Sequence, residues 1–516
     1  MGKDVWRGTT WKRRTKVHCL TALAAVTALA ISAGAASGQT PGAGEAGGAV
    51  TAAAPAYVPP LWSIAPFALL LLAIAIVPLV PACAKFWHRN RNKLLVALGL
   101  SAPVLLFYFA LHPSMTVREG EHLAELAAGL PVLKHVLSLA LLEAFVPFIT
   151  LLFCLYTISG GIQVRGDMAA HPVTNTGFMA MGAVLASIIG TTGAAMLLIR
   201  PLLETNKERK RVRHTVVFFI FIVCNIGGCL LPTGDPPLFL GYLMGVPFLW
   251  TLGLAAEWAI ACAILLVVYY LWDTAAYRRE APEDIAVDEA AAEPLRISGK
   301  INLAYLAGVV LAVALLVPDQ PFVFYPAFKV PPYLREGVML LLVVASFLTT
   351  PRGVREANQF SFSAIAEVAA LFIGIFITMQ APIEILQVRG PTLGMTEPWQ
   401  FFWAAGSLSS FLDNAPTYVV FFETANSLTS APGAGIMELT NGQHIRLDLL
   451  VAVSLGAVFM GANTYIGNGP NFMVKAIAEE RGIKMPSFFG YMLYSIGILI
   501  PIFLVLTLVF FVLKWI

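Results

Sequence analysis

The chain has 516 residues, of which 58% are hydrophobic and only 12% are charged, and its formal net charge at pH 7 is +3. A soluble domain carries roughly 25% charged residues because its surface faces water, so this composition excludes an ordinary soluble protein. The small net charge gives no basis for binding nucleic acid.

Apolar runs of about 20 residues recur along the chain, and an α-helix needs this length to cross a bilayer core of roughly 30 Å. Two such runs, 173–200 and 399–428, are interrupted near their midpoints by Gly, Pro or Asp. The expected fold class is an all-α polytopic membrane protein. The other predicted spans are 61–84, 94–112, 135–158, 215–231 continuing past 237, 250–272, 301–318, 336–350, 362–388, 447–464 continuing past 470, and 487–513.

The N-terminus has the pattern of a secretory signal peptide. Basic residues between Arg7 and Lys16 precede a short apolar run at 20–31, and small residues follow it up to Ser37. Cleavage after this segment and its retention as an uncleaved anchor are both open. The stretch 38–60 is rich in Gly, Ala and Pro and predicts a flexible exported linker.

The distribution of Lys and Arg predicts the topology, because short basic loops stay in the cytoplasm. The strongest basic cluster is 200–213. A single crossing by 173–200 would place its two flanking loops on opposite sides, whereas the charges and the preceding spans place both inside. A re-entrant hairpin entered from the cytoplasm removes this conflict, and the same reasoning makes 399–428 a hairpin entered from the periplasm.

Two hairpins that open to opposite sides predict a pair of inverted repeats, each with a re-entrant hairpin and a broken transmembrane helix. The predicted boundaries are 1–37 for the signal segment or anchor, 38–60 for the linker, 61–272 for the first repeat, 273–300 for a cytoplasmic linker and 301–516 for the second repeat.

Four polar breaks interrupt these apolar segments, at 190–193, 225–237, 409–416 and 461–471. Irregular backbone at membrane depth is tolerated only where it is buried in protein or lines a wet cavity. A single break is more often a simple kink, but paired broken helices in matching positions mark a substrate site.

Two carboxylates lie inside the breaks, Asp235 and Asp413. Burial favours the protonated form of a carboxyl group and a bound cation favours the ionised form, so one buried Asp can hold either a proton or Na⁺. Asp235, in Gly-Asp-Pro, can also be a helix cap, and Glu367 is a further candidate for a proton relay. The predicted ion-binding residues are Asp413, Asn414, Thr191, Thr192, Asn225, Asp235, Ser409, Ser410, Asn463 and Asn468, with Asp413 and Asn414 as Na⁺ ligands.

An enzymatic reading has little support. The chain contains no Gly-x-Ser-x-Gly elbow, phosphate-binding loop or His-Glu-x-x-His motif, and its six cysteines lack metal-binding spacing. We expect no resident cofactor, with Na⁺ and H⁺ as transported substrates.

The break motifs resemble those of the ion transporter superfamily, which includes NhaD-type sodium/proton antiporters, citrate/metal symporters and arsenite permeases. The resemblance covers about 60–516 and rests on Asn-Ile-Gly-Gly from Asn225, Pro-Thr-Gly-Asp-Pro-Pro from Pro232, Ser-Ser-Phe-Leu-Asp-Asn-Ala-Pro from Ser409 and Gly-Ala-Asn-Thr-Tyr-Ile-Gly-Asn from Gly461.

This resemblance implies a scaffold domain that forms a homodimer, a mobile transport domain with two hairpins, and elevator-type alternation. It also implies a cation site made by Asp413, Asn414, Thr191, Asn225, Asp235 and Asn463. The chain departs from the antiporters where Pro236-Pro237-Leu238 replaces a small hydroxyl pair, and in its Gly-Asn-Gly-Pro-Asn ending at Asn471. These departures place it near a divergent branch of the kind labelled citrate transporters.

The predicted function is Na⁺/H⁺ antiport in the bacterial inner membrane, with Asp413 alternately binding the cation and the proton. Both carboxylates lie in breaks and no arginine does, whereas a citrate substrate usually needs cationic partners. Cation-coupled citrate or dicarboxylate transport remains the alternative because helix N-termini alone can hold a carboxylate. Arsenite efflux is a further alternative.

Overall fold

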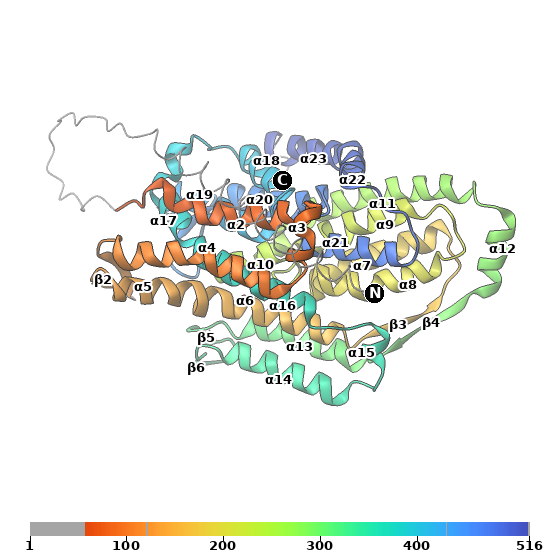
Figure 1. The fold of residues 1–516 in the computed structure, drawn as a ribbon, viewed down its shortest axis with the longest axis horizontal. Helices are drawn as coiled ribbons and strands as arrows, with labels where there is room; N and C mark the ends of the chain where they lie inside the picture. Colours follow the sequence, from red (N-terminus) through yellow and green to blue (C-terminus); the bar gives the residue numbers. More distant parts are fainter. Residues whose placement is uncertain (1–56, 120–121, 430, 514–516) are drawn as a thin grey trace, which may run out of the picture. The chain divides into compact units, whose positions relative to one another are not determined.

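The structure is a computed structural model that describes residues 57–119, 122–429 and 431–513 (Figure 1). The predicted signal segment 1–37 and most of the predicted linker 38–60 lie outside these residues. The chain divides into two compact units, a smaller one of Met1–Phe145 with Ala366–Leu393 and a larger one of Val146–Ile365 with Gly394–Ile516. The two units are separated by the contacts within each of them and not by a similarity between two halves of the chain, so the repeat boundaries stay a prediction.

Long apolar helices confirm the predicted fold class of an all-α polytopic membrane protein. Each predicted apolar run coincides with one or more helical segments. Five helices are long and apolar enough to cross a membrane, and a bent pair adds a sixth candidate among the described residues. The five are Asn90–Ala110, Leu130–Ser159, Pro172–Ile189, Phe248–Tyr277 and Phe488–Val512, and the bent pair is Ser363–Thr378 with Gln380–Leu393.

The smaller unit packs its helices around an apolar cluster that includes Val104, Phe107 and Val132. Two glutamates predicted inside apolar runs are partnered here. Glu367 forms an ion pair with Lys93, and Glu384 accepts a hydrogen bond from Tyr108. Its elements are α2 (Ala65–Ile76), α3 (Pro81–Trp87), α4 (Asn90–Ala110), β1 (Met115–Glu119), β2 (His122–Leu126), α5 (Leu130–Leu137), a π-helical segment (Ser138–Phe145), most of α16 (Ser363–Thr378), and α17 (Gln380–Arg389).

The larger unit contains both interrupted runs and both broken helices. Its elements are α6 (Val146–Ser159), β3 (Gln163–Asp167), α7 (Pro172–Ile189), α8 (Thr191–Thr205), α9 (Arg213–Ile222), α10 (Pro236–Leu243), α11 (Ala255–Tyr277), α12 (Pro282–Ala291), β4 (Glu293–Ser298), α13 (Ile301–Leu315), β5 (Pro321–Phe322), β6 (Tyr325–Lys329), α14 (Leu334–Thr349), α15 (Val354–Ala357), α18 (Pro398–Ser409), α19 (Asn414–Ser427), β7 (Ile436–Glu438), β8 (His444–Arg446), α20 (Leu447–Met460), α21 (Gly469–Glu480), α22 (Phe488–Tyr494) and α23 (Ile500–Leu506).

Two predicted segments differ in detail. The run 362–388, predicted as one span, bends by 41° between α16 and α17. Pro382 lies in the first turn of α17, where its ring removes a backbone donor and clashes with the preceding turn of a continuous helix. The predicted linker 273–300 is largely structured, because α11 extends to Tyr277, α12 follows, and β4 pairs with β3 in an antiparallel ribbon.

Helices α18 and α20 approach each other closely at Gly456. A Cβ atom at Gly456 would lie 2.5 Å from the carbonyl oxygen of Phe402 and 3.2 Å from its Cα, both of which are backbone atoms. Because backbone cannot move aside as a flexible side chain can, glycine sets the distance between these two helices.

We expect Gly456→Ala to destabilise the protein by about 1–3 kcal/mol, since the added methyl group forces α18 and α20 apart. Gly99→Ala is the matched control, because Gly99 also lies in a helix but has nothing within 4 Å of an added Cβ atom. It should leave stability unchanged or raise it slightly. Thermal unfolding of the purified variants in detergent measures both, and equal melting temperatures for the two would contradict the packing argument.

Candidate functional site

The first hairpin turns at Gly190, which ends α7 and precedes α8. Its φ of +83° is one that residues with a side chain rarely adopt. Immediately after the turn, the backbone N–H of Thr191 donates to the carbonyl of Gly234 at 2.8 Å. Ser187, one turn before the tip, donates to the carbonyl of Gly227 at 2.5 Å. The hairpin tip is therefore bonded directly to the break between α9 and α10.

The second hairpin, α18 with α19, contacts the second break in the same manner. Ser409 donates to the carbonyl of Ala457 at 2.7 Å, and Ser410 donates to that of Met460 at 3.1 Å. Asn463, in the break, donates to the Ser410 hydroxyl at 2.9 Å. Hydroxyl groups at both tips thus satisfy carbonyls that the broken helices leave without an intrahelical partner.

A matched pair of glycines allows each break to fold tightly. A Cβ atom at Gly234 would overlap the carbonyl oxygen of Gly228, and one at Gly467 would lie 2.6 Å from that of Gly461. The two breaks therefore share one local geometry, with glycines six residues apart in each. Whether the two halves are related by inversion across the membrane stays a prediction.

Asp235 lies where the two hairpins and the two breaks meet, and its side chain is buried. One carboxylate oxygen accepts hydrogen bonds from Thr191 at 3.0 Å and from Asn468 at 3.1 Å. The other accepts from Asn414 at 2.5 Å. The three donors come from the tips of both hairpins and from the second break, and Asp235 itself lies in the first break. One carboxylate therefore connects all four segments. We call Asp235, Thr191, Asn414 and Asn468 the Asp235 cluster.

A second set of amides joins the two breaks. Asn225 donates to the side-chain oxygen of Asn471 at 2.8 Å, and Asn471 donates to the carbonyls of Gly461 and Thr464, both at 2.9 Å. Asn471 was missed as a site residue in the sequence analysis, although it ends the fourth break. A buried amide inside a Gly/Pro-rich break was the available signal.

Three buried amide oxygens near these contacts accept no hydrogen bond from any described residue. They belong to Asn225, Asn414 and Asn463. In Asn414 the orientation is determined by Asp235, because only the NH₂ group can face a carboxylate and the oxygen must then point elsewhere. A buried hydrogen-bond acceptor without a partner lowers the stability of the protein. These oxygens are therefore available to a ligand that accepts electron pairs, such as a cation.

Asp413 has a different environment from the one the sequence favoured. Its half-buried carboxylate caps α19, accepting from the backbone N–H of Ala415 at 3.1 Å. The helix-cap interpretation offered for Asp235 thus applies to Asp413, since the Asp235 side chain makes no cap hydrogen bond to α10. Thr192 lies half-buried in the first turn of α8 and, among the described residues, makes no side-chain hydrogen bond to the Asp235 cluster.

Residues 57–511 match a family model described as "Putative citrate transport". The chain belongs to this family. A comparison with curated proteins gives no match. Membership of the citrate transport family identifies this multi-pass membrane protein as a transporter of the secondary type and favours transport over an enzymatic activity.

Exchanging Asn225 or Asn471 for leucine should destabilise the protein by about 1–3 kcal/mol each, because the partner amide is left buried and unpaired. The double variant should lose clearly less than the sum of the two single losses, since the hydrogen bond between the two amides can be lost only once. Thermal unfolding of the four proteins measures this coupling. Strictly additive losses would show that the Asn225–Asn471 bond does not join the breaks.

Proposed function

We propose that this protein is a Na⁺/H⁺ antiporter that binds Na⁺ at the Asp235 cluster. The observation that carries the proposal is the buried Asp235 carboxylate, hydrogen-bonded by three neutral side chains beside amide oxygens without partners. Asp413 serves as the second carboxylate of the same region. This assignment moves the central role from Asp413 to Asp235.

Asp235 receives its side-chain hydrogen bonds from neutral donors only. Both of its oxygens accept hydrogen bonds, and an ionised carboxylate is a pure acceptor. No basic side chain forms an ion pair with Asp235 among the described residues, and a buried charge without a counter-ion costs several kcal/mol. The helix that follows offers limited help, because Pro236 and Pro237 remove two N–H groups from its first turn. A bound cation would supply the missing charge.

The chemistry of the available ligands fits a small hard cation. Carboxylate and amide oxygens are hard donors, and the free oxygens of Asn225, Asn414 and Asn463 are of this type. No cluster of His, Cys, Asp and Glu suited to a transition metal occurs among the described residues. Hard oxygen ligands favour Na⁺ over soft metal ions.

Exchange follows from the competition of two cations for one carboxylate. A proton on Asp235 neutralises the charge that holds Na⁺, so each occupant displaces the other. Asp413 directly precedes Asn414, which donates to Asp235, so the second carboxylate belongs to the same region. Two carboxylates in one region favour a bound cation more strongly than one carboxylate does.

Cation-coupled citrate transport is the second candidate. The family description supports it, and so do the helix N-termini around the Asp235 cluster. Helices α8, α10, α19 and α21 all begin at or beside its members, at Thr191, Pro236, Asn414 and Gly469. Helix N-termini attract carboxylates, so a substrate anion beside a bound Na⁺ suits this arrangement.

The proposal also includes the location of the protein in a bacterial inner membrane and its assembly as a homodimer.

In liposomes that contain a pH-sensitive dye, Na⁺ added to the purified protein should move protons, and citrate should not be needed. Asp235→Asn should lower this response roughly tenfold or more, because it removes the charged ligand. Asp413→Asn tests the second carboxylate, and Asp319→Asn is the control because Asp319 is an exposed loop residue with the same change of charge. Proton movement that appears only with citrate would favour the second candidate, and an unaltered response in Asp235→Asn would refute the site.

The apparent affinity for Na⁺ should fall as the pH is lowered, since H⁺ and Na⁺ compete for one carboxylate. Once this group is mostly protonated, the half-saturating Na⁺ concentration should rise by about tenfold for each pH unit. Transport rates measured against Na⁺ at several pH values test this. A half-saturating concentration that does not depend on pH would contradict exchange at a shared site.

A further inference from the structure

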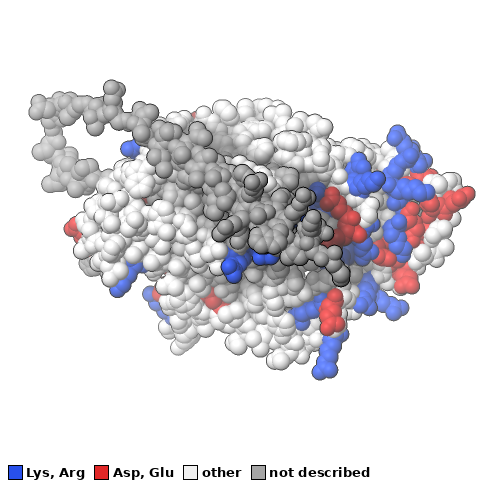
Figure 2. Space-filling view, in the orientation of Figure 1, with Lys and Arg blue, Asp and Glu red and all other residues white. Residues whose placement is uncertain are grey.

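A groove of about 810 Å³ lies in the larger unit where the ends of α9 and α11 meet α22. Arg211, Arg213 and Arg279 line one side, and Leu271, Trp272 and Tyr494 line another. In Figure 2, charged side chains of both signs gather over α12 and the helix ends beside it. The groove therefore joins a basic margin to an apolar wall.

The three arginines lack acidic partners. Among the described residues, no carboxylate lies within ion-pair distance of Arg211, Arg213 or Arg279, whereas Lys210 is paired with Asp284 at 2.6 Å. Arg211 donates to the carbonyl of Arg279 at 2.5 Å, and Arg213 donates to that of Lys484 at 2.7 Å. Three guanidinium groups at one groove, none of them in an ion pair among the described residues, favour an anionic ligand.

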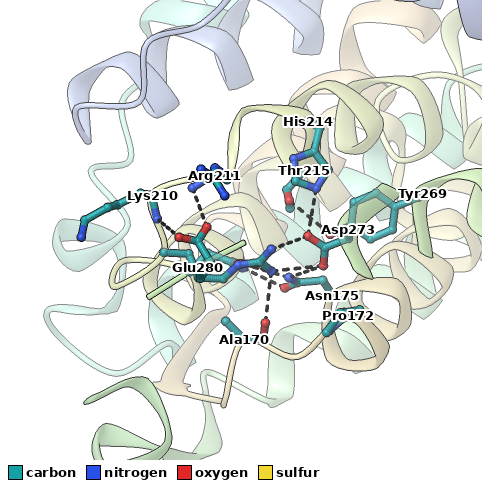
Figure 3. A network of polar contacts seen from close by, with 12 residues as sticks. Ala170, Pro172, Asn175, Lys210, Arg211, His214, Thr215, Tyr269, Asp273 and Glu280 are labelled. Carbon is teal, nitrogen blue, oxygen red and sulfur yellow. Dashed lines mark hydrogen bonds and ion pairs between the residues drawn. The ribbon is translucent and has the colours of Figure 1, made fainter. Parts of the chain in front are cut away.

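A buried network holds this basic segment in place (Figure 3). Asp273 of α11 accepts from Arg209 at 2.6 Å and from His214 at 2.9 Å, so it binds both ends of the turn between α8 and α9. The backbone N–H of Arg211 donates to Glu280 at 2.8 Å. The turn that carries Arg211 and Arg213 is thus fixed before any ligand binds, which lowers the entropy lost on binding.

The apolar wall has the character of a membrane-facing surface. Leu271 is 62% exposed and Trp272 is 42% exposed. Trp272 stacks on Tyr494, with ring centroids 6.0 Å apart, and on His214 at 6.2 Å. Tryptophan and tyrosine beside basic residues are typical of the boundary between lipid chains and head groups.

We propose that this groove binds one anionic phospholipid, with its phosphate on Arg211, Arg213 and Arg279 and an acyl chain along Leu271 and Trp272. A guanidinium group can donate two parallel hydrogen bonds to a phosphate group, and basic pockets between membrane helices bind anionic head groups. A free phosphate ion would satisfy the arginines but would leave the exposed apolar wall uncovered, so the lipid is the occupant that matches both sides. The site is separate from the Asp235 cluster.

The test titrates the full chain in neutral detergent with phosphatidylglycerol, phosphatidylcholine or inorganic phosphate and follows thermal unfolding. Phosphatidylglycerol should raise the melting temperature more than phosphatidylcholine does. The variant Arg211→Gln/Arg213→Gln/Arg279→Gln should bind phosphatidylglycerol roughly tenfold more weakly or worse. The control Arg296→Gln/Arg352→Gln/Arg389→Gln, which removes the same charge from exposed positions outside the groove, should bind as the unaltered protein does.

Ala275→Trp provides a second test if the triple variant fails to fold. Ala275 lines the groove and is exposed, so a tryptophan ring at this position would fill the space beside the apolar wall and leave all three arginines in place. This variant should also weaken phosphatidylglycerol binding. Unaltered binding by Ala275→Trp, equal losses in the two triple variants, equal stabilisation by phosphatidylcholine, or the same stabilisation by millimolar phosphate would each overturn the proposal.

Discussion

The larger unit depends on one buried carboxylate that cannot be satisfied locally. Asp235 begins α10 but makes no cap hydrogen bond to it, so its partners come from elsewhere: Thr191, Asn414 and Asn468. These donors belong to the two hairpin tips and the second break. Because leaving a buried carboxylate unpaired costs several kcal/mol, the four segments are held in one arrangement. None of these partners carries a positive charge, and this is the basis of the cation binding that we propose.

Broken helices pose a second problem, because each break leaves backbone groups without intrahelical partners. The chain solves it with short side chains. Ser187 donates to a carbonyl in the first break, Ser409 and Ser410 donate to carbonyls in the last turn of α20, and Asn471 donates to two more in the second break. These contacts consume the donors of the breaks while amide oxygens remain free. The irregular backbone inside this membrane protein is thereby stabilised by side chains of the protein itself.

A different type of buried charge organises the end of the larger unit near α12. Asp273 is fully buried but forms an ion pair with Arg209 and a hydrogen bond with His214, unlike Asp235, which has neutral partners only. Compensation makes the Asp273 network a fixed anchor for the turn between α8 and α9. Since α8 also carries Thr191 at its other end, the anchored turn and the Asp235 cluster lie on the same helix. The two buried carboxylates thus differ in their partners, one having a basic partner and the other only neutral ones.

The length of apolar runs and the polar breaks within them are local properties of the sequence. The sequence alone therefore determined the helical membrane fold and the interruptions at Gly190 and Asp413. It also placed four residues of one cluster among the candidates: Asp235, Thr191, Asn414 and Asn468. It did not determine which carboxylate the other segments contact. The bond from Asn414 to Asp235 joins residues 179 apart, and that from Asn468 joins residues 233 apart. Such pairings depend on how the helices pack. The hydrogen bond between Asn225 and Asn471 and the groove beside Arg211 depend on it in the same way. Only the tertiary structure decides them, because periodicity and composition carry no information about which distant segments meet.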